Sequence, residues 1–158
     1  SDEIFHWIRG QTDSEHIFAL LMQHIVEVRG EGPRLTEDQI KQCFQKTFDV
    51  LQQLKVEAGI GEEVSNFNMM VTNGRRIFGT RYSSNPDKET RTLYYAAGTD
   101  FQCKDGVYHM EGDGSDHETV LIVSEKLTEN EQDWNPIPPN HFISVDRDLQ
   151  IRLNPMQH

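Results

Sequence analysis

The stretch FNMMVTNGRRIFGTRY, residues 67–82, decides the fold class of this sequence. Its first half alternates between two faces, with Phe67, Met69 and Val71 on one of them. A period of two with apolar residues on one face is typical of a half-buried strand. The Asn-Gly pair at 73–74 favours a tight turn, and RRIFGTRY then returns as a second strand. The sequence therefore predicts an antiparallel hairpin here.

Two helices are expected before this hairpin. Thr12 and Glu15 form a capping box, in which each side chain bonds a backbone N–H near the helix start. Asp13 lies in the same first turn, where the helix dipole favours a carboxylate. The capping box does not need Asp13, so its carboxylate is free to hold a ligand ammonium. The apolar residues with helical spacing that follow are Phe18, Leu21, Met22 and Ile25, and we expect them to form the buried face.

The second helix repeats this pattern. Thr36 and Gln39 form another capping box, and Gly59 is expected just past the helix end, where a left-handed residue is common. The apolar stripe consists of Ile40, Cys43, Phe44, Phe48, Leu51 and Leu54. Because Cys43 lies on this stripe, we interpret it as a small core residue rather than a nucleophile.

The rest of the chain reads as strands joined by turns. The expected strands are TLYYAAG (92–98), GVYHME (106–111), ETVLIVS (118–124), HFISV (141–145) and LQIRL (149–153). ETVLIVS is nearly all apolar, so we expect it to be a central strand. Strands 92–98 and 118–124 have few polar positions, as if both sheet faces were covered. Helices followed by hairpin-linked strands indicate an α+β fold with a largely antiparallel sheet.

Composition and charge exclude several classes of protein. The 158 residues suffice for one domain, and the formal net charge of −11 argues against a nucleic-acid partner. No apolar run is long enough to span a membrane, and the first ten residues do not resemble a signal peptide. Two distant cysteines, Cys43 and Cys103, suggest no disulfide framework, which fits a reducing cytoplasm.

The acidic run MEGDGSDHE (110–118) is a candidate metal loop. Its ligand types are Glu111, Asp113, Asp116, His117 and Glu118, and His109 lies just before it. The EF-hand spacing is absent, and no known zinc spacing connects the histidines. We expect a solvated hairpin loop there, and no metal or other cofactor.

Other polar or aromatic candidates have simpler interpretations. Ser1 could act as an N-terminal nucleophile, but we expect it only to be where this chain begins. No G-x-S-x-G motif supports a serine hydrolase. We assign Asn66 and Asn68 to ordinary turn and strand-edge chemistry. Trp134, in the proline-rich loop DWNPIPPN, is expected to pack against the fold and hold that loop in place.

Three motifs in order resemble the class II glutamine amidotransferases. They are RGQTDSEHIFALL (9–21), FNMMVTNGRRIFGTRY (67–82) and VLIVSEKLTENEQDWNPIPPN (120–140). They look most like the amidotransferase-like subunit of the fungal glutathione-degradation complex and its bacterial relatives. The resemblance runs from Gly10 to about Val145.

This resemblance implies the αββα sandwich of hydrolases with an N-terminal nucleophile, which would account for the doubly covered strands. It also implies that Asp13 binds the α-ammonium of a glutamine or γ-glutamyl substrate. Thr12 and Glu15 would keep their capping roles and hold Asp13 in position. Lys126 stands where the family usually has proline, and we assign no chemistry to the neighbouring Ser124 or Glu125.

The sequence also departs from the family. The family's nucleophile is a cysteine at the mature N-terminus, and its substrate-clamping arginine and oxyanion segment also lie upstream of the T-D-S-E motif. Cys43 and Cys103 match no nucleophile position. We therefore expect residues 1–158 to be the C-terminal part of a single amidotransferase domain, with no catalytic residue of its own and with the N-terminal half as its missing partner.

The resemblance implies an enzyme that hydrolyses γ-glutamyl amides, glutamine or glutathione, in the cytoplasm, together with a metallopeptidase-like partner subunit. The alternative is a non-catalytic binding or assembly module that keeps only the fold. A third possibility, a calcium or metal protein using the loop 110–118, would require metal binding that stabilises the fold.

Overall fold

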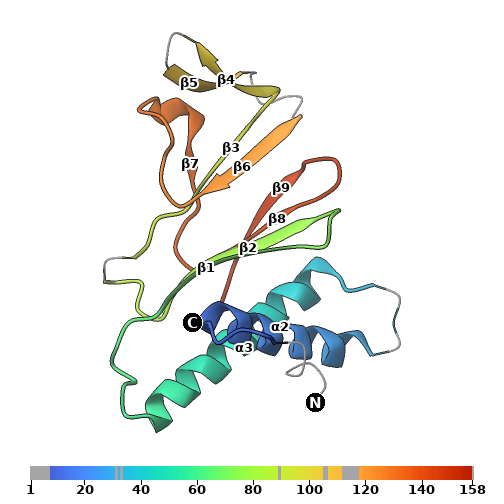
Figure 1. Ribbon diagram of the computed structural model, residues 1–158, viewed down its shortest axis with the longest axis vertical. Coiled ribbons are helices and arrows are strands. Elements are labelled where there is room, and N and C mark those ends of the chain that lie inside the picture. Colours follow the sequence, from blue (N-terminus) through green and yellow to red (C-terminus); the bar gives the residue numbers. More distant parts are fainter. Residues whose placement is uncertain are drawn as a thin grey trace. The chain divides into compact units, whose positions relative to one another are not determined.

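The computed structural model of the chain describes residues 8–30, 32, 34–88, 90–104, 107–111 and 118–157 (Figure 1). At 104, 107–109 and 111 only the backbone is described. The chain divides into two compact units, Ser1–Glu63 and Val64–His158. The first contains helices and the second contains strands, so the predicted α+β class is confirmed.

The helical unit contains α2, Asp13–Arg29, and α3, Glu37–Glu57, which contact each other. Thr36 caps α3 with the predicted capping box. Its hydroxyl accepts from the N–H of Gln39 at 3.3 Å, and the Gln39 side chain accepts from the N–H of Thr36 at 2.9 Å. These bonds satisfy two of the donors that a helix start leaves free.

The end of α3 is also as predicted. Gly59 has a φ of +77°, and its N–H donates to the carbonyl of Val56 at 3.0 Å. The N–H of Ile60 donates to the carbonyl of Lys55, also at 3.0 Å. This pair of bonds is the Schellman motif, which requires a left-handed residue where Gly59 lies.

The apolar stripe of α3 is buried over most of its length. Ile40, Cys43, Phe44 and Phe48 are buried, and the rings of the two phenylalanines lie 6.2 Å apart. Leu54, the last member of the stripe, is 53% exposed. The predicted face is therefore confirmed except in its last turn.

The buried face predicted for α2 was partly wrong. Phe18 is 45% exposed, whereas Leu21 is fully buried as expected. Ala19 and His24 are buried instead. The reason is that apolar residues lie nearly all round this helix, so their spacing does not define one face. The polar His24, which sequence periodicity would place outside, occupies the buried side.

The strand unit contains a four-stranded antiparallel sheet. Its strands are β1 (Asn66–Thr72), β2 (Ile77–Ser83), β8 (His141–Val145) and β9 (Ile151–Pro155), in the order β1-β2-β8-β9 (Figure 1). Both predicted hairpins, β1–β2 and β8–β9, are present.

The turn of the first hairpin is centred one residue later than the Asn-Gly signal suggests. Asn73 donates its N–H to the carbonyl of Arg76 at 3.3 Å, so Gly74 and Arg75 are the two central residues. Gly74 has a φ of +78°, in the left-handed region that glycine adopts without strain. The Asn73 side chain accepts from the N–H groups of Arg75 and Arg76, both at 3.0 Å.

A second, three-stranded sheet has the order β6-β3-β7. Its strands are β3 (Tyr94–Gly98), β6 (Thr119–Val123) and the two-residue β7 (Asn135–Pro136). The expectation that ETVLIVS is a central strand was wrong for the described residues, since β6 pairs only with β3. β4 (Asp100–Lys104) pairs with β5 (Val107–Glu111), and β4 was not predicted. A short 3-10 helix spans Glu131–Asp133.

The core of the strand unit lies between the two larger sheets. Leu93, Ile137 and Ile143 form its buried centre. Tyr95 and Ile122 from the three-stranded sheet, and Ile151 and Leu153 from β9, pack against this centre. β8 is buried on both faces, since Phe142 and Ile143 point to opposite sides and neither is exposed. Both faces of β8 are therefore covered by other residues. In β6, by contrast, all five residues are only half-buried.

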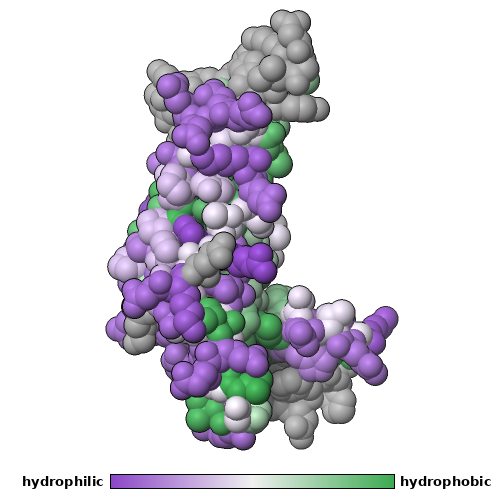
Figure 2. Space-filling view, turned by 90° about the vertical axis from the view of Figure 1, so that its left-hand side faces the viewer, coloured by the Kyte–Doolittle hydropathy of each residue, from purple (hydrophilic) through white to green (hydrophobic). Residues whose placement is uncertain are grey.

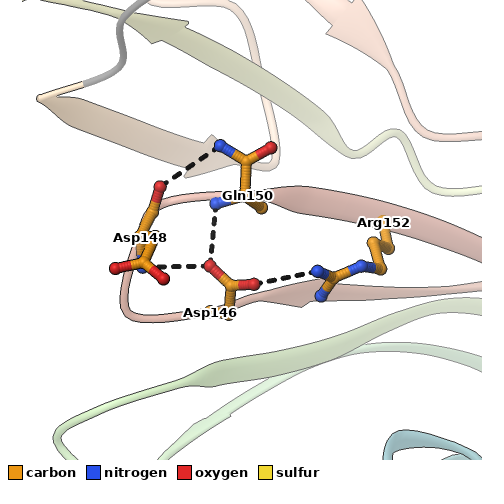
Figure 3. A network of polar contacts seen from close by, with 4 residues as sticks. All are labelled: Asp146, Asp148, Gln150 and Arg152. Atoms are coloured by element: carbon orange, nitrogen blue, oxygen red, sulfur yellow. Dashed lines mark hydrogen bonds and ion pairs between the residues drawn. The ribbon is translucent and has the colours of Figure 1, made fainter.

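The β8–β9 turn is held by one carboxylate (Figure 3). Oδ1 of Asp146 accepts from the N–H groups of Asp148 and Gln150, both at 3.0 Å, and Oδ2 accepts from Nη2 of Arg152 at 2.9 Å. Partial burial raises the pKa of Asp146, but the bonds from Gln150, Arg152 and Asp148 lower it more. The net pKa lies below the usual value for aspartate.

Hydrophilic residues predominate on the face in Figure 2, with hydrophobic residues exposed in patches. The exposed large hydrophobic residues are Phe18, Val26, Leu54, Val56, Ile60, Met70 and Leu127. Within the described part of the chain, no helix has the length and apolar character needed to cross a membrane.

Candidate functional site

The candidate substrate-binding residue lies at the start of α2. Thr12 is the N-cap, and its hydroxyl accepts from the N–H of Glu15 at 3.4 Å. Its carbonyl accepts from the N–H groups of Glu15 and His16 at 3.1 and 3.3 Å, and Nδ1 of His16 lies 2.9 Å from the same oxygen. The position of the helix start is therefore set by local bonds.

Glu15 has a different role from the one that the capping box predicted. Its carboxylate accepts from the N–H of Gly10 at 3.2 Å and from the Thr12 hydroxyl at 3.0 Å, not from the Thr12 N–H. A Cβ atom at Gly10 would lie 1.8 Å from Oε2 of Glu15. Gly10 thus leaves room for the carboxylate, and Glu15 fixes the chain segment that enters the helix.

Asp13 is the first residue of α2, and it is exposed. Among the described residues its carboxylate has no hydrogen-bond or ion-pair partner, in contrast to that of Glu15. It lies next to the N–H groups of the first helical turn, whose partial positive charge favours an anion. A carboxylate without a partner, held at a fixed helix position, can bind an ammonium group.

The two cysteines differ in accessibility. Cys43 in α3 is fully buried, and burial raises the pKa of its thiol, with Lys46 lowering it and Glu27 raising it by smaller amounts. A buried thiol with a raised pKa is a poor nucleophile, because the thiolate is the reactive form. This confirms the interpretation of Cys43 as a core residue. Cys103 in β4 is exposed, and both thiols are free.

The arginine of the TRY sequence is a structural clamp that sequence reasoning missed. Arg81 lies opposite Asn68 on the β1–β2 ladder. Its guanidinium donates to the carbonyls of Arg91 and Ile137 and to the Thr90 hydroxyl. Burial lowers the pKa of Arg81, and Tyr94 raises it by a smaller amount. Because three acceptors engage it, this guanidinium ties the segment before β3 to the sheet.

Asn66 and Asn68 lie on β1, an edge strand of the four-stranded sheet. Nδ2 of Asn68 donates to the carbonyl of Thr92 at 2.7 Å, and this bond fixes the orientation of its carboxamide. Oδ1 of each asparagine is buried without a donor among the described residues. Both side chains lie on the same face of β1, since they are two residues apart. They present two unused acceptors, and no motif had identified them as such.

The loop after β6 is held in place by its tryptophan, as predicted. Trp134 is buried, its indole N–H donates to the Thr128 hydroxyl at 2.9 Å, and its ring meets Phe101 edge-on at 6.3 Å. Nζ of Lys126 lies 3.2 Å from Oε1 of Glu131 and 5.3 Å from the centre of the Tyr94 ring. These contacts give Lys126 a packing role in the loop.

Several candidates cannot be placed. Ser1 and residues 112–117 lie outside the described residues, and so do the side chains of His109 and Glu111. Glu118, the last member of the acidic run, is exposed. Within the described ranges, no three His, Cys, Asp or Glu side chains come close enough together to hold a metal ion.

Comparison with known proteins agrees with these motifs. The family model described as "Glutamine amidotransferases class-II" matches residues 2–156. The chain is 27% identical over 164 residues to "Probable glutamine amidotransferase DUG3" of Saccharomyces cerevisiae. That alignment covers 98% of this chain and 45% of the yeast protein, so the chain spans less than half the length of this relative. The chain therefore belongs to the class II glutamine amidotransferase family.

Proposed function

We propose that the protein containing this chain hydrolyses γ-glutamyl amides, with glutamine and glutathione as substrates. The family assignment and the unpaired carboxylate of Asp13 support this activity. We assign the α-ammonium of the substrate to Asp13, because both side chains that cap the helix start have other partners. Thr12 and Glu15 are then positioning residues, which keep Asp13 at the first position of α2.

The nucleophile in this proposal is a cysteine at the mature N-terminus, outside residues 1–158. The burial of Cys43 and the raised pKa of its thiol support this assignment. The thiolate adds to the γ-carbonyl, and the C–N bond breaks as the leaving amine takes up a proton. The resulting γ-glutamyl thioester is hydrolysed by water, which releases glutamate and regenerates the thiol.

The remaining parts of the proposal concern assembly. We propose that residues 1–158 form the C-terminal part of one amidotransferase domain, an αββα sandwich whose remaining part lies upstream. Two helices followed by two stacked sheets are compatible with such layers. We also propose a metallopeptidase-like partner subunit and a cytoplasmic location, for which two free thiols are suitable.

The test uses the complete protein, alone and with its partner subunit. Released glutamate is measured with glutamine and with glutathione as substrate, and the protein is quenched in acid to trap the thioester. We expect glutamate release and a γ-glutamyl adduct on a cysteine outside residues 1–158. An adduct on Cys103, or no turnover under either condition, would contradict the proposal. Binding of glutamine without turnover would favour a non-catalytic module instead.

A further inference from the structure

β6 is an edge strand with the composition of an internal one. It pairs with β3 along its whole length, from Thr119 opposite Gly98 to Val123 opposite Tyr94. On its other side, no strand pairs with it among the residues that the structure describes. Figure 1 shows β6 at the margin of this sheet. Its backbone N–H and C=O groups on that side are therefore available to a further strand.

Natural proteins usually protect such edges with charges or proline. Among the other edge strands of these two sheets, β7 and β9 follow this rule, whereas β1 has two asparagines but no charge or proline. β7 contains Pro136, and β9 contains Arg152 and Pro155. The sequence of β6, TVLIV, contains neither a charged residue nor proline nor glycine. An unprotected apolar edge favours pairing with another chain segment, because nothing in its sequence opposes it.

The burial of β6 supports the same conclusion. All five of its residues are half-buried, on both faces of the strand. Ile122 packs against the inter-sheet core formed by Leu93, Ile137 and Ile143. Apolar residues on both faces are typical of strands inside a sheet, which pair on both sides. The sequence pattern of β6 is thus that of a strand with a neighbour on both sides. Among the described residues, the structure has a neighbour only on the β3 side.

We propose that the open edge of β6 pairs with an additional strand from a part of the same polypeptide outside residues 1–158. The yeast relative has enough chain to supply one, since the alignment covers only 45% of it. The incoming strand is extended and apolar on both faces. This inference rests on the sheet edge and does not depend on the proposed activity.

A second copy of this chain is a poorer occupant. Each copy carries a formal charge of −11, so two copies repel one another. Glu118 and Glu125 flank β6, and both are exposed. In a symmetric antiparallel pair of β6 strands, Glu118 of one copy would lie near Glu125 of the other. Like charges opposite each other destabilise a strand pair. Basic residues at the ends of the incoming strand would instead be complementary.

Residue-resolved hydrogen exchange on the complete protein tests the proposal. β2, which pairs on both sides, and β9, an edge strand, serve as internal references. We expect all five amides of β6 to exchange as slowly as those of β2. If alternate amides of β6 exchange as fast as the outward-facing amides of β9, the edge is open and the proposal is wrong.

Measurement at several protein concentrations, with sedimentation to follow the mass, identifies the occupant. Protection that is the same in a monomer at every concentration supports a strand from the same polypeptide. Protection that appears only as a dimer forms would overturn the proposal in favour of a second copy. Because neither readout uses turnover, the outcome is independent of the activity assay.

Discussion

Nδ1 of His24 lies 3.0 Å from Oγ1 of Thr47, and this contact joins α2 to α3. The Thr47 hydroxyl donates to the carbonyl of Cys43 at 2.8 Å, which uses its single proton. His24 must therefore donate from Nδ1, so the position of one proton on the ring is fixed. Burial lowers the pKa of His24, with Glu27 raising it and Lys46 lowering it by smaller amounts.

The first prediction concerns the pH dependence of stability. Because the folded pKa of His24 lies below the unfolded value of about 6.5, the unfolded state binds the proton more readily. The stabilising contribution is complete above pH 6.5 and is lost as the pH falls from there through the folded pKa. His24→Asn keeps a donor near Nδ1 and should flatten this dependence in denaturant unfolding.

His16→Asn is the matched control, since His16 is an exposed histidine of the same helix. If His16→Asn flattens the curve as much as His24→Asn does, the buried contact with Thr47 is not its cause.

The second prediction concerns substrate binding by Asp13. Asp13→Asn removes a charge-assisted contact worth about 1.5–3 kcal/mol, so the Kd for a γ-glutamyl ligand should rise roughly 10- to 150-fold. The melting temperature should change little, because Asp13 has no partner among the described residues. Calorimetric titration and thermal unfolding of the complete protein measure the two effects.

Glu15→Gln is the control for the effect on stability. Its carboxylate holds the N–H of Gly10 and the Thr12 hydroxyl, so stability should fall by about 1 kcal/mol. If Asp13→Asn mainly lowers the melting temperature, Asp13 has a structural role and the binding assignment fails.

The third prediction concerns the β8–β9 turn. Asp146→Ala leaves the N–H groups of Asp148 and Gln150 and the guanidinium of Arg152 without their shared acceptor. We expect a loss of about 1–2 kcal/mol, at the low end because water screens this turn. The folded pKa of Asp146 is lowered, so its contribution is present above the usual pKa of aspartate and disappears on acidification.

Asp148→Ala is the control for this turn, since its backbone N–H, not its carboxylate, bonds Asp146. Unfolding curves between pH 2 and pH 7 should differ between wild type and Asp146→Ala at neutral pH and converge in acid. Curves that stay equally far apart throughout would show that the carboxylate charge is not involved.

The fourth prediction concerns Asn140, which is buried and has a φ of +54°. Its Oδ1 accepts from the N–H of Ser83 at 2.7 Å, and its carbonyl accepts from the N–H of Met156 at 2.8 Å. Asn140→Gly keeps the left-handed backbone but leaves the Ser83 N–H unpaired, at a cost of about 1–3 kcal/mol. Asn140→Ala should cost about 1 kcal/mol more, because alanine is strained there.

Denaturant unfolding of the two variants separates the hydrogen bond from the backbone conformation. Equal stability of Asn140→Gly and Asn140→Ala would show that the positive φ carries no cost at this position.

The features that depend on residues close together in the chain were predicted correctly from the sequence. Thr12 and Thr36 cap helices, Gly59 ends one and Gly74 enters a turn, as the sequence indicates. In each case the relevant bond joins residues at most five positions apart, so neighbours in the chain suffice to specify it. The location of Asp13 at an exposed helix start follows from the same local rules.

Tertiary structure decided what depends on distant partners. Apolar residues nearly surround α2, so its sequence cannot choose between burying Phe18 and burying His24, and packing with Thr47 contributes to the choice. The acceptors of Arg81 come from residues 90, 91 and 137, which only the folded chain brings together. The apolar sequence of β6 accounts for the half-burial of all five of its residues. Its place at the sheet edge is set by which strands pair, a long-range property that periodicity does not encode.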